Sequence, residues 1–193
     1  QRKAVDLDPV SSLNHLNLAG FLYANGQLEQ SREQYLQGLD LSPDSKTWVH
    51  VRLMRISLLL GEMEQAAGLA MKLPEGSDRD LGLALALNEM GRSAEAAEAI
   101  QRLSNRGDVE SANQLVRLYA FGGEPDQAFL WLDKASNAVM ADGRSIKIKE
   151  FARQIRHSPF VRHLYGDKRW IAWTNRLQEF DTIPKHHRLA LIQ

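Results

Sequence analysis

Apolar residues recur along the first 140 or so residues at the spacing of one helix face. They form four pairs of segments, and the two members of each pair are separated by a turn that contains a glycine. The turn glycines are 35, 30 and 32 residues apart, at Gly26, Gly61, Gly91 and Gly123. A small residue stands five positions after each glycine, at Ser31, Ala66, Ala96 and Ala128. Glycine can adopt the left-handed conformation that ends a helix, and small residues let paired helices approach closely. The pattern therefore predicts successive helical hairpins that stack to share a core.

This register resembles the tetratricopeptide repeat (TPR), a helical hairpin of about 34 residues. The residues of the first full unit that carry the resemblance are Ala19, Leu22, Ser31, Tyr35, Gly38 and Pro43. The corresponding residues of the later units are Met54, Ser57, Ala66, Ala70 and Leu73; Ala84, Leu87, Ala96, Ile100 and Leu103; and Val116, Tyr119, Ala128, Leu132 and Ala135. The tryptophan that the family places early in the first helix is replaced by His15, His50, Asp80 and Ala112. The resemblance implies an all-α, right-handed α-solenoid of about four hairpins that acts as a protein–protein interaction scaffold.

The spacing divides the chain into a repeat array over residues 1–143 and a different segment over residues 144–193. We expect repeat units at about 12–46, 47–76, 77–108 and 109–141, preceded by the end of an earlier unit at 1–11, where Ala4 and Pro9 fit the closing positions. Because the chain begins at Gln1 with no apolar signal segment after it, we also expect it to be a piece of a longer protein.

The segment after residue 143 differs from the array in its charge. Residues 1–143 hold 13 Lys and Arg against 20 Asp and Glu, whereas residues 144–193 hold 11 against 4. Ser158 and Pro159 predict the start of a short helix, and Asp167 can cap the next one. Residues 158–170 are similar to the tail that closes repeat arrays in some bacterial transcriptional regulators and nucleotide cyclases. That similarity implies a helical cap on the last hairpin. It also gives an alternative function, the sensory or regulatory region of a bacterial transcription factor or signalling enzyme whose effector domain lies outside this chain.

Three interpretations are open for the basic residues of the cap, which include Arg144, Lys147, Lys149, Arg153, Arg156, Arg162, Lys168 and Arg169. They can form a solvated face, dock on the acidic repeats, or bind nucleic acid, in that order of preference. Nucleic acid comes last because no helix-turn-helix or zinc-finger signature frames these residues. The run at Lys185 to Arg188 predicts either a short helix or a loose tail.

The motifs of common enzymes and cofactor sites are absent from the sequence. There is no phosphate-binding loop, no Gly-x-Ser-x-Gly nucleophile motif and no cysteine. The six histidines lack the spacing of a metal site. We therefore predict no enzyme activity, no cofactor and no metal. No apolar run is long enough to span a membrane, so we predict no membrane insertion and a cytoplasmic location, with the periplasm as the alternative.

The first helix of each TPR unit lines the inner groove in that family, and the resemblance implies which residues would face a ligand here. They are Asn17, Tyr23, Trp48, Arg52, Arg55, Asn88, Glu89, Asn113, Arg117 and Phe121. Asparagine and arginine donors beside aromatic side chains suit an extended peptide or protein segment, with a preference for an acidic or carboxylate-bearing one. The alternative is that some of these residues meet a neighbouring segment of the same chain, with the basic end as the candidate. The sequence leaves the partner's identity and the oligomeric state open.

Overall fold

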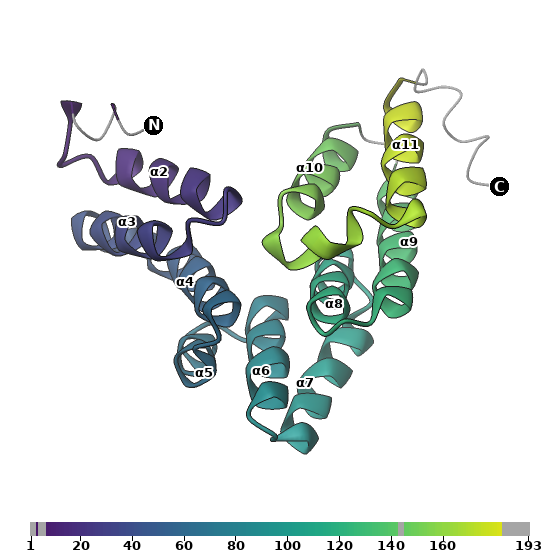
Figure 1. Cartoon of the computed structure of the whole chain (residues 1–193), viewed down its shortest axis with the longest axis horizontal. Helices are drawn as coiled ribbons and strands as arrows, with labels where there is room; N and C mark the ends of the chain where they lie inside the picture. The colour runs from purple at the N-terminus through teal and green to yellow at the C-terminus, as the bar shows by residue number, and fades with distance from the viewer. Residues whose placement is uncertain (1–2, 4–6, 143–144, 183–193) are drawn as a thin grey trace. The chain divides into compact units, whose positions relative to one another are not determined.

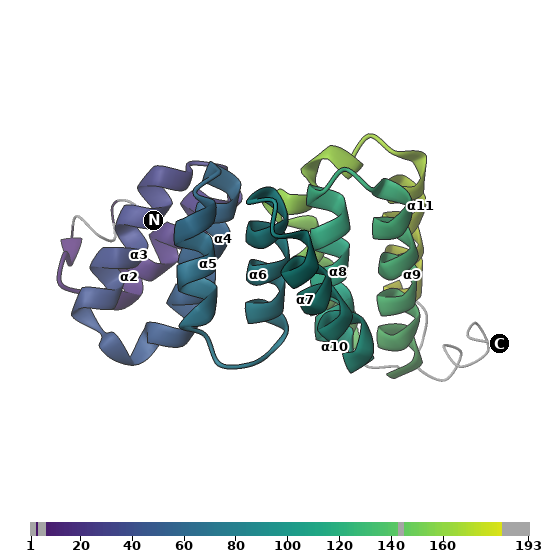
Figure 2. The same cartoon turned by 90° about the horizontal axis from the view of Figure 1, so that it is seen from below.

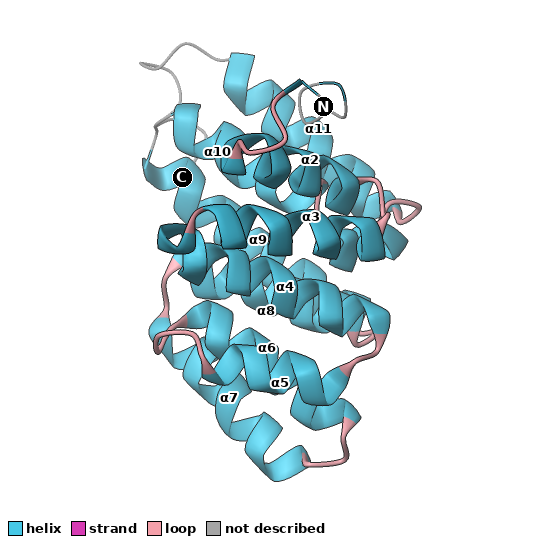
Figure 3. Cartoon of the chain, turned by 90° about the vertical axis from the view of Figure 1, so that its left-hand side faces the viewer, coloured by secondary structure: helices cyan, strands magenta, loops and turns pink. Residues whose placement is uncertain are grey.

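The computed structural model describes residues 3, 7–142 and 145–182, and these fold into helices joined by short turns (Figure 1). Within these ranges there is no strand, and Figure 3 shows only helices and loops. The helices are α2 (Ser12–Ala24), α3 (Leu28–Leu41), η1 (Pro43–Ser45), α4 (Lys46–Leu60), α5 (Met63–Met71), α6 (Ser77–Glu89), α7 (Ser93–Arg106), α8 (Val109–Phe121), α9 (Pro125–Asp142), α10 (Ser145–Arg156), η2 (Pro159–Leu164) and α11 (Lys168–Thr182). The predicted all-α fold of consecutive hairpins is confirmed for this part of the chain. Arg144, Ala4 and the basic run at 185–188 lie outside the described residues.

The four hairpin turns share one geometry. Gly26, Gly61, Gly91 and Gly123 have φ between 75° and 78°, the left-handed region in which a side chain is strained. The residue after each glycine donates its backbone N–H to the carbonyl oxygen five residues earlier, at 2.8–2.9 Å. These bonds pair carbonyl groups that the helix would otherwise leave without a donor. The predicted role of the turn glycines is therefore confirmed.

The chain divides into two compact units, Gln1–Arg102 and Leu103–Gln193. In the first unit, consecutive helices from α2 to α6 pack against one another (Figure 2). Small residues lie at these contacts: Ala66 and Ala70 of α5 are buried, and the Ser31 hydroxyl donates to the Ala19 carbonyl oxygen at 2.7 Å. One core cluster joins the first two hairpins and contains Leu16, Ala19, Tyr23, Tyr35, Val49, Leu53 and Ile56.

In the second unit, the predicted cap shares a core with the last hairpin. The cluster takes Val116, Phe129 and Leu132 from the hairpin α8–α9, and Phe151, Ile155, Val161, Leu164, Trp170, Trp173 and Leu177 from the cap. The Trp173 indole N–H donates to the Ser136 hydroxyl at 2.7 Å. The short helix that begins at Pro159 is a 3-10 helix, and its Phe160 is only 1% exposed. These contacts make α10, η2 and α11 part of one packed body with α8 and α9.

Candidate functional site

Two side chains of α4 lie on the preceding hairpin and remain accessible. Trp48 and Arg52 are four residues apart, so they share one face of the helix. The Trp48 ring is 45% exposed and packs edge-on against Tyr35 of α3, with ring centroids 6.0 Å apart and an interplanar angle of 84°. The Arg52 guanidinium carbon is 5.7 Å from the centroid of the Tyr23 ring on α2, within the range of a cation–π interaction. We call Tyr23, Tyr35, Trp48 and Arg52 the aromatic–arginine surface.

Arg52 and Arg55 differ in their electrostatic environments although they are only three residues apart. Arg55 is buried, and its guanidinium forms an ion pair of 2.6 Å with Asp78 of α6. Arg52 is half-buried, and among the described residues its guanidinium has no hydrogen bond or ion pair. A guanidinium held against aromatic rings is partly desolvated, which strengthens its attraction to an incoming carboxylate. Among the described residues, Arg52 is thus the charge of this surface without a charged partner, whereas Arg55 links α4 to α6.

Tyr35 is the buried ring of α3 on which the Trp48 ring packs. It is 2% exposed, and burial raises the pKa of its phenol, while the nearby positive charge of Arg52 opposes that rise. The phenol therefore stays protonated at neutral pH. Its hydroxyl oxygen lies 3.7 Å from the place that a Cβ on Gly20 would occupy. In the repeat pattern Tyr35 stands at a packing position, so its place in the sequence does not assign it to the site. The one feature of the sequence that could have assigned Tyr35 to the site is an aromatic residue at a predicted helix–helix contact.

The other residues predicted in the first unit do not join this surface. Asn17, Asn88 and Glu89 are exposed. In the part of the chain that the structure describes, their side chains make no hydrogen bond, ion pair or ring contact with the four residues of the surface. Of the seven groove residues predicted in this unit, the structure therefore brings together Tyr23, Trp48 and Arg52.

Two of the three predicted residues of the second unit, Arg117 and Phe121, lie against the chain's own cap. Asn113 and Arg117 are each 3% exposed. The Arg117 guanidinium donates a hydrogen bond to the carbonyl oxygen of Gln154 at 3.4 Å. Gln154 lies in the last turn of α10, where the helix dipole stabilises a positive charge. The Phe121 ring packs on Phe160, with centroids 5.3 Å apart. For Arg117 and Phe121, the geometry matches the alternative in which the basic end of the chain occupies this face.

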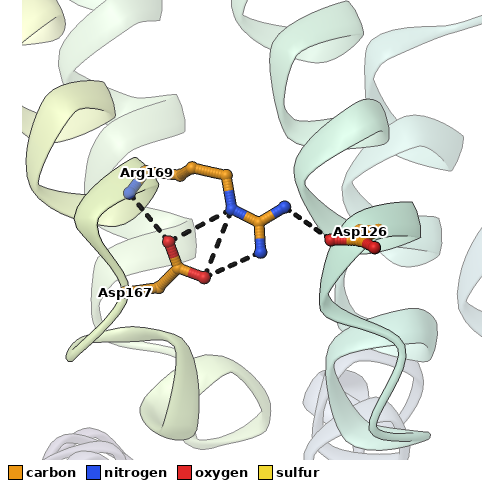
Figure 4. Close-up of polar contacts among 3 residues, drawn as sticks. All are labelled: Asp126, Asp167 and Arg169. Carbon is orange, nitrogen blue, oxygen red and sulfur yellow. Dashed lines mark hydrogen bonds and ion pairs between the residues drawn. The ribbon is translucent and has the colours of Figure 1, made fainter.

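The cap also contacts acidic residues of α9. Arg169 donates to Asp167 in the turn before α11 and forms an ion pair of 2.7 Å with Asp126 of α9, as Figure 4 shows. Its guanidinium lies 4.2 Å from the centroid of the Phe129 ring. Another cap arginine, Arg176, pairs with α9 at 3.1 Å. These contacts match the interpretation in which basic residues dock on the acidic repeats.

Other arginines of the cap have a different environment. Arg153 and Glu150 form an exposed ion pair within α10, at 2.7 Å. This pair matches the interpretation of a solvated face. Among the described arginines of the cap, Arg169 and Arg176 thus pair with α9, whereas Arg153 pairs within α10.

The described residues were compared with the requirements of a metal site and of a membrane-spanning helix. No three His, Asp or Glu side chains are grouped so that they could hold a metal ion. Within the same ranges, no helix has the length and hydropathy needed to cross a membrane.

Solved structures with a similar chain trace are known, and one of them is compared with this chain here. No family model matches the chain, and no curated protein matches it. The solved structure is described as "YrrB: a TPR protein with an unusual peptide-binding site". It is similar over 98% of this chain and 96% of its own, with 15% sequence identity and a TM-score of 0.46. In this chain, the left-handed glycine turns and the buried small residues at helix contacts make the architecture one of consecutive helical hairpins.

Proposed function

We propose that the first unit is a protein-binding module whose aromatic–arginine surface holds a carboxylate-bearing segment of a partner protein. The observation that carries this proposal is Arg52, a half-buried guanidinium on Tyr23 with no hydrogen bond or ion pair among the described residues. A carboxylate placed there would form charge-assisted hydrogen bonds in a partly desolvated setting.

Trp48 supplies the apolar part of the same contact. Its exposed indole lies one helical turn from Arg52 and packs edge-on against the buried Tyr35 ring, which holds it in place. Tryptophan and arginine are the residue types most enriched among those that dominate binding energy at protein interfaces. A ring already held in place loses little side-chain entropy when a partner binds. The surface therefore suits a short segment with an acidic group beside an apolar residue.

This role requires no catalytic residue and no cofactor. It also fits the predicted alternative, the sensory region of a bacterial transcription factor or signalling enzyme, because such a region acts by binding. A cytoplasmic location stays a prediction.

A random peptide library selected on the full chain tests the proposal. We expect the selected peptides to be enriched in Asp, Glu or a free C-terminal carboxylate. Arg52→Ala and Trp48→Ala should each weaken the selected peptides about tenfold or more, which corresponds to about 1.4 kcal/mol. The matched control is Arg79→Ala, since Arg79 is a half-buried arginine of α6 whose side chain contacts Met71.

Stability measurements separate binding from folding. Arg52→Ala should change the free energy of unfolding by no more than about 2 kcal/mol, the usual upper size of a partly desolvated cation–π contact. Arg52→Lys keeps the charge but loses the planar fork, so its affinity should lie between those of wild type and Arg52→Ala. Selected peptides without acidic groups, or equal binding by the Arg52→Ala and Arg79→Ala variants, would contradict the proposal.

A further inference from the structure

The cap carries an exposed aromatic residue, Tyr165, at the turn between η2 and α11. Tyr165 is 40% exposed, and its ring lies on the Trp170 ring, with centroids 4.9 Å apart and an interplanar angle of 31°. The Tyr165 hydroxyl donates a hydrogen bond to the backbone carbonyl oxygen of Arg156, the last residue of α10. Contacts with both α10 and α11 therefore hold the exposed ring in place.

Two arginines lie close to the Tyr165 phenol. Burial raises the pKa of the phenol, whereas the positive charges of Arg162 and Arg156 oppose that rise, as only nearby charges do. The backbone N–H of Tyr165 donates to the Arg162 carbonyl oxygen at 3.2 Å. A turn of this 3-10 type places residues three apart on one edge, so the Arg162 and Tyr165 side chains share that edge. We call Arg156, Arg162 and Tyr165 the cap-turn surface.

Little negative charge compensates the basic residues around this surface. Within residues 151–177 the sequence has a single acidic residue, Asp167, and it pairs with Arg169. Arg156 and Lys168 are exposed, and among the described residues their side chains make no hydrogen bond or ion pair. The surface therefore attracts an anionic partner.

We propose that the cap-turn surface is a second protein-binding surface, which holds an acidic segment of a partner protein. Carboxylates of that segment form charge-assisted hydrogen bonds with Arg156 and Arg162, and a neighbouring apolar side chain packs on the Tyr165 ring. Tyrosine and arginine are enriched among the residues that dominate binding energy at interfaces. A ring already held in place loses little side-chain entropy on binding. This surface belongs to the second unit, so it is separate from the aromatic–arginine surface of the first.

The small extent of the positive surface favours a protein segment over nucleic acid. A single strand needs a basic groove that follows several phosphates. Beyond the cap turn, Arg169 and Arg176 already pair with aspartates of α9. Those carboxylates would repel a phosphate backbone that continued in that direction. A short acidic segment needs only the guanidinium groups beside Tyr165.

A labelled peptide of alternating Glu and Leu tests the proposal, with the full chain carrying Arg52→Ala so that the charge of the first surface is absent. We expect Arg156→Ala and Arg162→Ala each to weaken this peptide about fivefold or more, because charge-assisted bonds are lost. Arg153→Ala is the matched control, since Arg153 is an exposed arginine of the same helix that pairs with Glu150. This control should bind the peptide as the background chain does. Helical circular dichroism should be unchanged in every variant.

NMR spectra of the background chain locate the bound peptide. The amide signals of Arg162, Tyr165 and Gly166 should shift when the peptide is added. The affinity should fall with added salt, which screens exposed charges.

Three outcomes would overturn the proposal. They are unchanged amide signals at the cap turn, equal weakening by Arg153→Ala and Arg156→Ala, and tighter binding of oligothymidylate than of the peptide, which would favour nucleic acid. The effect of Arg52→Ala on library-selected peptides is measured separately, so the two binding proposals can fail independently.

Discussion

Gly82 lies in the middle of α6, where this helix approaches both α4 and α5. A Cβ at this position would be 2.8 Å from the Ala70 Cβ and 2.8 Å from the Met54 Sδ. The methionine side chain can move, but the Ala70 Cβ is fixed to its backbone. We therefore expect Gly82→Ala to reduce the free energy of unfolding by about 1–3 kcal/mol, the usual cost of overpacking.

The chain offers a matched control for this prediction in Gly68 of α5, where an added Cβ would have no atom within 4 Å. Gly68→Ala should be neutral or stabilise by up to about 1 kcal/mol, because alanine restricts the unfolded chain and favours helix. Urea unfolding of the two variants gives the comparison. Equal stability of both variants would show that the helices separate without cost at Gly82.

Three arginines predicted for one groove have three different environments. Arg52 lies on Tyr23, Arg55 pairs with Asp78, and Arg117 donates to the carbonyl of Gln154. Repeat spacing places all three arginines on the first helix of a hairpin. The sequence does not specify which groups each guanidinium contacts. Their partners come from other segments, and Gln154 belongs to a helix outside the repeat pattern, so periodicity could not identify that contact.

At the scale of the element, the hairpins were predictable because each depends on local rules. A glycine at the turn, helical spacing of apolar residues and a small residue at the helix contact together specify the hairpin. Asp167 is confirmed as the predicted N-terminal capping residue of α11, because its carboxylate accepts a hydrogen bond from the backbone N–H of Arg169 at 2.8 Å. The sequence could not predict that the same arginine also reaches Asp126 on α9, because that contact depends on how α11 packs.

The contact between Asp167 and Arg169 predicts a pH dependence for the second unit. Hydrogen bonds from the Arg169 side chain and backbone hold the pKa of the Asp167 carboxyl below its ordinary value, while the same pairing raises the pKa of Arg169. A depressed pKa in the folded state stabilises the fold above the pKa of the unfolded aspartate, about 4. That stabilisation is lost as the pH falls through the folded-state pKa.

The expected result is that Asp167→Asn lowers the melting temperature at pH 7 and has a smaller effect in acid. Tryptophan fluorescence is a suitable probe, since Trp170 lies in the helix that Asp167 caps. The control is Asp40→Asn, an exposed aspartate of α3 with no ion pair among the described residues. If Asp167→Asn and wild type differ equally at pH 7 and in acid, the carboxylate charge does not stabilise this helix.

At the scale of the whole molecule, the two units differ in how well the sequence specifies them. The first unit is built from repeats, so its helices, turns and small contact residues follow from one pattern. The second unit joins a repeat hairpin to a nonrepeating cap. The sequence predicts a cap from Ser158, Pro159 and Asp167 and offers the basic end as an alternative neighbour of the groove residues. It does not specify that α10 contacts Arg117 of α8 and that η2 contacts Phe121. Contacts between segments of different design have no periodic signal, so only the structure shows them.

Removal of the cap is therefore expected to disrupt the second unit. Deletion of residues 145–193 removes seven members of the core cluster, among them Phe151, Val161 and Trp173, and uncovers Val116 and Leu132. A newly exposed apolar patch of this kind promotes aggregation or partial unfolding. We expect the truncated chain to bind a hydrophobic dye, to elute as aggregate in gel filtration and to unfold less cooperatively than the full chain. Ile171→Ala in the full chain is the control, because Ile171 is 52% exposed on α11 and its loss should leave these measurements unchanged. A truncated chain with wild-type elution and cooperativity would mean that α8 and α9 are stable without the cap, and that the cap is an independent module.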